Sequence, residues 1–113
     1  MKRCEISVLT NFNGQKKVHK YMAIKNDSVI KYIDLEKNRI CLNLEKNILE
    51  RENRDYKFII DFDNNNIEIY IKKLKNKIDK KIKTLMIDKN NNSFLVKYFL
   101  TDEKEVNEYS IKY

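Results

Sequence analysis

The residue types and spacing from Asp61 onward resemble those of a calcium-binding loop. Asp61, Asp63 and Asn65 stand at positions 1, 3 and 5, where such a loop supplies oxygen ligands. Position 6 is Asn66 instead of the glycine that the sharp turn needs, and position 12 is Lys72 instead of a bidentate glutamate. A lysine at the last ligand position would repel the cation. The segment is therefore predicted to be a polar turn and not a metal site.

Other kinds of reactive site are excluded by the scarcity of the residues that they need. His19 is the only histidine, whereas metal centres and nucleophile–base pairs need a second matched group, so we expect it to be structural. Gly14 is the only glycine, so no glycine-rich loop can cradle a phosphate. The alternating charges between Glu45 and Asp55 predict a solvated, self-neutralising turn region. We therefore expect no catalytic residue, no metal ligand and no cofactor, and a protein that is not an enzyme.

A lysine-rich segment is the remaining candidate for chemistry. The net charge of +7 is concentrated in this segment, where seven lysines accompany a single acidic residue, Asp79. The lysines could neutralise the phosphates of a nucleic acid while Tyr70 stacks on a base. They could equally form a solvated surface that protects an exposed sheet edge from aggregation. The candidate polyanion-binding residues are Lys72, Lys73, Lys75, Lys77, Lys80, Lys81 and Lys83.

The only glycine also marks the turn of a predicted β-hairpin. Asn13-Gly14 is the strongest two-residue signal for a type I′ turn, because both residues accept positive φ. With this turn, Phe12 would pair with Gln15 and Val8 with His19. One face of the hairpin then collects mostly apolar and aromatic side chains, namely Cys4, Ile6, Val8, Phe12, His19, Tyr21 and Ala23.

Short runs with β-strand patterning continue along the chain, separated by breaks rich in asparagine and aspartate. They predict an all-β fold of eight or nine strands, a meander that closes into a barrel or folds into a sandwich. The segment 67–85 has two interpretations. It is either a strand, a turn near Asn76 and a second strand, or an amphipathic helix, because its apolar residues recur at helical spacing. A basic helix there would suit attachment to an anionic lipid surface.

The series RICLNLEKNILERENRDYKFIIDF (39–62), followed by IEIYIKKL, SFLVKYFL and EYSIKY, resembles the YwiB-like family of uncharacterised bacterial proteins. The matching points are a strand that ends in Arg51, a strand that ends in the aromatic Phe62, and a near-terminal strand with Tyr98. The resemblance implies a small, calycin-like (lipocalin-like) antiparallel β-barrel without catalytic residues. The stretch before IEIYIKKL is much shorter here, only DNNN (63–66), which predicts a shortened or incompletely closed barrel.

The remaining features predict a single cytoplasmic domain that spans residues 1–113. No apolar run approaches the roughly 18 residues that a membrane span requires, and the first residues lack the pattern of a signal peptide. Cys4 and Cys41 lack the spacing of metal ligands and are expected to be reduced, partly buried thiols.

Together these features predict a binding or interaction module for an unknown ligand. A small apolar ligand would lie inside the barrel, although in a barrel of this size side chains are expected to fill the interior. The alternative function is nucleic-acid binding through the segment Lys72–Lys83. An open sheet edge would be covered by a second copy, giving a homodimer by strand-edge pairing. The candidate pocket residues are Ile6, Val8, Tyr21, Phe58, Ile60 and Tyr98.

Overall fold

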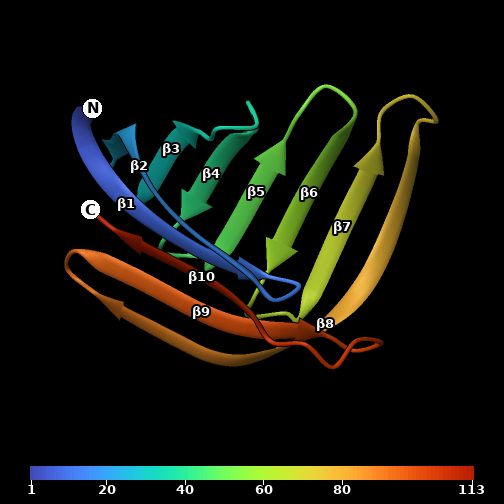
Figure 1. Ribbon diagram of the computed structural model, residues 1–113. Helices are drawn as coiled ribbons and strands as arrows, with labels where there is room; N and C mark the ends of the chain where they lie inside the picture. Colours follow the sequence, from blue (N-terminus) through green and yellow to red (C-terminus); the bar gives the residue numbers. More distant parts are fainter.

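The computed structural model describes all residues from Met1 to Tyr113, and its regular secondary structure consists of β-strands. Ten strands follow one another in antiparallel order around a closed barrel (Figure 1). None of the chain forms a helix of the length and apolarity needed to cross a membrane. The strands are β1 (Lys2–Phe12), β2 (Gln15–Asn26), β3 (Val29–Ile33), β4 (Arg39–Asn43), β5 (Ile48–Glu52), β6 (Tyr56–Asp61), β7 (Asn66–Ile71), β8 (Asn76–Asn90), β9 (Ser93–Leu100) and β10 (Asn107–Lys112).

Pairing of the first strand with the last closes the barrel, which corrects the expectation of an incompletely closed one. β1 and β10 pair from Ser7 opposite Lys112 to Asn11 opposite Glu108. The short stretch 63–66 does not remove a hairpin either, because β6 and β7 pair along their whole length across it. The side chain of Asp61 accepts a hydrogen bond from the backbone N–H of Asn64 at 3.2 Å. The polar turn predicted from Asp61 onward is therefore confirmed.

The hairpin predicted at Asn13-Gly14 forms in the predicted register. Phe12 pairs with Gln15, and Val8 pairs with His19. Asn13 has a φ of 53° and Gly14 a φ of 76°, so both lie in the left-handed region that a type I′ turn requires. Later turns reach positive φ without glycine, through Asp27, Lys37, Asn47, Asn65 and Lys75.

The segment 67–85 is a strand, a turn and a strand, so the helical interpretation is wrong. The turn lies at 72–75, just before Asn76, and Ile69 of β7 pairs with Ile78 of β8. The proposed lipid-binding helix does not form. β8 is long and strongly curved in Figure 1, and it pairs with β9 only from Ile82 onward.

One strand lies where the charges predicted a turn region. Glu50, Arg51 and Glu52 belong to β5, which pairs with β4 on one side and β6 on the other. The structure therefore has ten strands instead of eight or nine. The alternation of charge was interpreted as a turn because only Leu49 of this strand is fully buried, whereas the family resemblance implied a strand that ends in Arg51.

The hydrophobic core fills the half of the barrel that lies toward the two chain termini. Aromatic rings of Phe62 and Phe94 pack there with centroids 6.4 Å apart. The ring of Phe62 also packs against that of Tyr98, with centroids 5.3 Å apart. The most deeply buried apolar side chains are Ile6, Ala23, Ile30, Leu42, Phe62, Phe94, Val96 and Ile111.

Replacing Gly14 tests the requirement for positive φ at the first turn. A Cβ atom there would meet no atom within 4 Å, so the substitution strains only the backbone. We expect Gly14→Ala to lower the free energy of unfolding by about 1 kcal/mol, because an L-residue is disfavoured in the left-handed region. Denaturant titration measures this difference. Asn13→Gly is the control and should stay within about 0.5 kcal/mol of the wild type, because glycine adopts positive φ readily.

Candidate functional site

A cavity of about 740 Å³ occupies the half of the barrel away from the chain termini. Inward-facing side chains of the strands form its wall, and residues of the β1–β2 and β3–β4 turns and of the β9–β10 loop border its mouth. Side chains fill the interior only at the other half, so the expectation of a filled barrel is wrong. Ten strands enclose a wider lumen than the eight that side chains alone can fill.

Five of the six candidate pocket residues line this cavity. Four strands supply these residues, which are Val8, Tyr21, Phe58, Ile60 and Tyr98. Their convergence follows from the two-residue period of β-strands, because each of them lies on the inward face.

Ile6 is the exception and corrects the predicted set. It shares the inward face with Val8, but it lies one step closer to the chain termini and is only 1% exposed. It therefore packs in the core beneath the cavity and cannot contact a ligand in it.

Arg51 is a charged residue in the cavity wall that was not among the candidate pocket residues. It stands between two apolar inward-facing neighbours, with Ile40 opposite it on β4 and Phe58 opposite it on β6. Its Nε atom is buried and has no hydrogen-bond partner. The signal in the sequence was the spacing of two from Leu49, which is buried and sets the inward face of β5.

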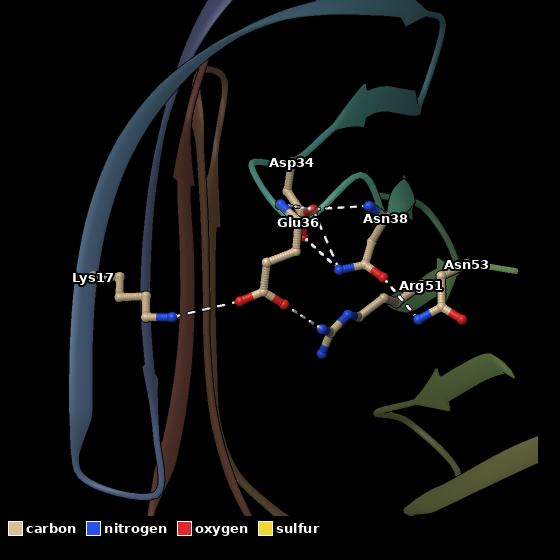
Figure 2. Close-up of polar contacts among 6 residues, drawn as sticks. All are labelled: Lys17, Asp34, Glu36, Asn38, Arg51 and Asn53. Carbon is tan, nitrogen blue, oxygen red and sulfur yellow. Dashed lines mark hydrogen bonds and ion pairs between the residues drawn. The ribbon is translucent and has the colours of Figure 1, made fainter. Parts of the chain in front are cut away.

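Glu36 joins the two cations at the mouth of the cavity. Its carboxylate lies 3.3 Å from Nη2 of Arg51 and 3.6 Å from Nζ of Lys17 (Figure 2). The glutamate side chain is 63% exposed, so each of these ion pairs is solvated and weak. Glu36 thus spans the mouth from β2 to β5 through contacts that can break at little cost.

The loop that carries Glu36 is held by a network of short polar side chains (Figure 2). Asp34 Oδ1 accepts hydrogen bonds from the backbone N–H groups of Glu36 at 3.0 Å and Asn38 at 2.9 Å. Asn38 is 1% exposed, and its side-chain oxygen accepts a hydrogen bond from Nδ2 of Asn53 at 3.0 Å. The network ties the β3–β4 loop to the β5–β6 turn and fixes the backbone of Glu36.

Tyrosines supply the polar groups deeper in the cavity. The hydroxyl groups of Tyr32 and Tyr109 lie 2.8 Å apart and form a buried hydrogen bond, and the ring of Tyr21 stacks on that of Tyr32. Burial raises the pKa of Tyr98 to about 12 and also holds the pKa of Tyr32 and Tyr109 above the ordinary value. The positive charge of Arg51 is a smaller effect that lowers the pKa of Tyr32 and Tyr98.

The barrel wall has a gap beside the cavity. β2 pairs with β3 only through Ile24, Lys25 and Asn26, whereas it pairs with β1 along its whole length. Lys17 and Tyr21, on the part of β2 without a second neighbour, line the cavity across from Asp34. The Lys17–Glu36 ion pair is a direct contact across this gap.

Two of the candidate polyanion-binding lysines are paired with carboxylates, and one lies on the inward-facing set of β8. Lys72 bonds Glu52 at 2.8 Å, and Lys77 lies 3.6 Å from Glu68. Lys80 pairs with Ile67 and so belongs to the inward-facing set of β8. The other candidates lie in the turn or on the outward set: Lys73, Lys75, Lys81 and Lys83.

The single histidine and the two cysteines lie in different surroundings. His19 lines the cavity, and its ring centroid is 6.1 Å from that of Tyr21. Cys4 and Cys41 are half-buried and unpaired, and burial raises the pKa of the Cys41 thiol. Histidine, cysteine and carboxylate side chains nowhere form a group of three that could hold a metal ion.

The raised pKa of Tyr98 predicts a stability change at alkaline pH. The phenol has a pKa near 10 in the unfolded chain and about 12 in the folded protein, so unfolding releases its proton between these values. The stability that it contributes is complete below pH 10 and is lost as the pH rises through 12. Tyr98→Phe should therefore flatten the decline in unfolding free energy over this range, measured by denaturant titration. An unchanged slope would contradict the burial of the phenol, and Tyr56→Phe at an exposed tyrosine is the control.

Comparisons with known proteins do not assign this chain to a family. No protein-family model matches it, and neither does any curated protein or solved structure.

Proposed function

We propose that this protein is a non-enzymatic, calycin-like barrel of the bacterial cytoplasm that binds a small, largely apolar ligand in its interior. The observation that supports this proposal is the open cavity of about 740 Å³ above a fully packed core. Ligand cavities in proteins generally measure about 300–1,000 Å³ and are lined by apolar and aromatic side chains with a few polar groups.

The composition of the cavity wall favours an apolar ligand body. Val8, Leu49 and Ile60 face the cavity, together with the rings of Phe58 and Tyr98. Removing such surface from water contributes about 25 cal/mol per Å² of apolar area. A ligand that covers these side chains would gain binding free energy without needing a hydrogen bond at every contact.

Nucleic-acid binding through the segment Lys72–Lys83 has less support. Glu68 of β7 lies directly opposite Asp79 of β8 in the strand register, and Asp79 stands between the outward-facing Lys77 and Lys81. These carboxylates would repel a phosphate chain that followed the strand. A nucleic-acid groove needs lysines that converge from several strands, and here they divide between a turn and both faces of one hairpin.

A neutral fluorescent dye, Nile red, tests the proposed ligand site. We expect the protein to bind it with enhanced emission, and Thr10→Trp to weaken binding at least about 10-fold by filling the lumen. Thr10 is half-buried and faces the cavity from β1, opposite Tyr109 and Lys17. Lys16→Trp, at an exposed outward position beside it, is the matched control and should leave binding unchanged.

The proposal is wrong if the wild type does not bind the dye, or if both tryptophan variants affect binding equally. Fluorescence anisotropy of labelled oligonucleotides tests the alternative function, which is nucleic-acid binding through the segment Lys72–Lys83. Affinity that falls steeply with salt and disappears when Lys73, Lys75, Lys81 and Lys83 are replaced by glutamine would favour a nucleic acid.

A further inference from the structure

The guanidinium group of Arg51 has hydrogen-bonding capacity that the protein does not use. Arginine carries five N–H donors in a fixed fork. One of them, on Nη2, contacts Glu36 Oε2 at 3.3 Å. The Nε atom is buried and has no partner. A buried donor without an acceptor is unfavourable, since it has lost its hydrogen bond to water.

The surroundings of Arg51 define what could use these donors. Ile40 and Phe58, its cross-strand neighbours, have no side-chain acceptor to offer. A carboxylate has two oxygens at the spacing of the guanidinium fork and can accept from two of its N–H groups together. Glu36 makes only the one contact with this fork, so it does not provide this arrangement.

Glu36 can leave Arg51 without a change in the loop. The hydrogen bonds that Asp34 accepts from the backbone N–H groups of Glu36 and Asn38 hold the loop backbone and do not involve the Glu36 side chain. The carboxylate itself is mostly exposed and can turn into solvent by rotation about its side-chain bonds. The place that the Glu36 carboxylate occupies beside Arg51, at the mouth of the cavity, then becomes free for another anion.

We propose that the ligand is an amphipathic carboxylic acid whose carboxylate displaces Glu36 from Arg51 while its apolar chain lies in the barrel. This inference rests on the proposed function, because it assigns the ligand class of the same cavity. Glu36 then acts as a built-in competitor that covers the unliganded guanidinium group. Lys17, the other cation that contacts Glu36, would remain at the mouth to attract the incoming anion.

The other charges at the mouth are acidic and must be weighed against this assignment. Asp34 already accepts two backbone hydrogen bonds and two contacts from the Asn38 amide, so its charge is largely satisfied. Glu103 lies on the exposed β9–β10 loop at the rim. Neither carboxylate stands between two apolar neighbours on the wall, as Arg51 does. The charge that faces the apolar lumen is therefore positive, which favours an anion over a cation.

Three ligands with the same alkyl chain test the charge preference. Laurate, 1-dodecanol and dodecylamine would be titrated below their micellar concentrations in competition with Nile red. Laurate should bind at least about 10-fold more tightly than dodecanol, as expected for charge-assisted hydrogen bonds. Dodecylamine should bind more weakly than either. Equal binding of laurate and dodecanol, or preference for the amine, would overturn the assignment even if the dye binds.

Two substitutions test the roles of Arg51 and Glu36. Arg51→Met should weaken laurate binding about 10- to 100-fold and leave dodecanol binding within about twofold. Glu36→Gln should strengthen laurate binding, because it removes the competing carboxylate. Arg39→Gln is the matched control, since Arg39 is an exposed arginine on the outer face of β4 that pairs with Glu52.

The outcomes separate this inference from the proposed function. If neither the dye nor any of the three ligands binds the wild type, the interior site itself is wrong, and this inference fails with it. If all three bind with similar affinity and Arg51→Met changes none of them, the interior site stands and the carboxylate site is overturned. The wild-type comparison does not depend on whether a variant folds.

Discussion

The structure depends on the hydrogen-bonded closure between β1 and β10. This pairing turns a meander into a ring, and in a closed ring the alternation along each strand divides all side chains into an inner and an outer set. The inner set must either fill the lumen or leave a cavity. Large rings such as Phe62 and Phe94 fill it near the chain termini, whereas the other half is left open. The packed core and the cavity are thus two results of one geometric constraint.

Local features of the fold could be predicted from the sequence because local chemistry determines them. The turn at Asn13-Gly14 set the register of the first hairpin, and the polar turn after Asp61 was recognised from its side chains. Closure could not be predicted in this way. It joins segments about a hundred residues apart, and no short pattern in Ser7–Asn11 or Asn107–Lys112 indicates the partner of either strand.

The candidate site was predictable to the extent that it depends on the two-residue period. The inward face was assigned correctly for Val8, Tyr21 and Tyr98, but the period says nothing about position along the barrel axis, so Ile6 was wrongly included. Arg51 was missed because a charged residue among other charges is usually solvated. The volume of the cavity is a difference between what ten strands enclose and what their side chains fill. That difference cannot be read from any one segment.

The gap between β2 and β3 gives the barrel an uneven distribution of local stability. Residues 15–23 of β2 have a hydrogen-bonded strand on one side only, and their inward side chains from Gln15 to His19 face the cavity instead of the packed core. Segments of this kind open with a lower free energy than the whole molecule, in cooperative units that exchange their amide hydrogens faster. The outer part of the β1–β2 hairpin can therefore fluctuate outward while the core keeps its packing. A molecule could enter the lumen through such sub-global motion, and the barrel would not need to unfold.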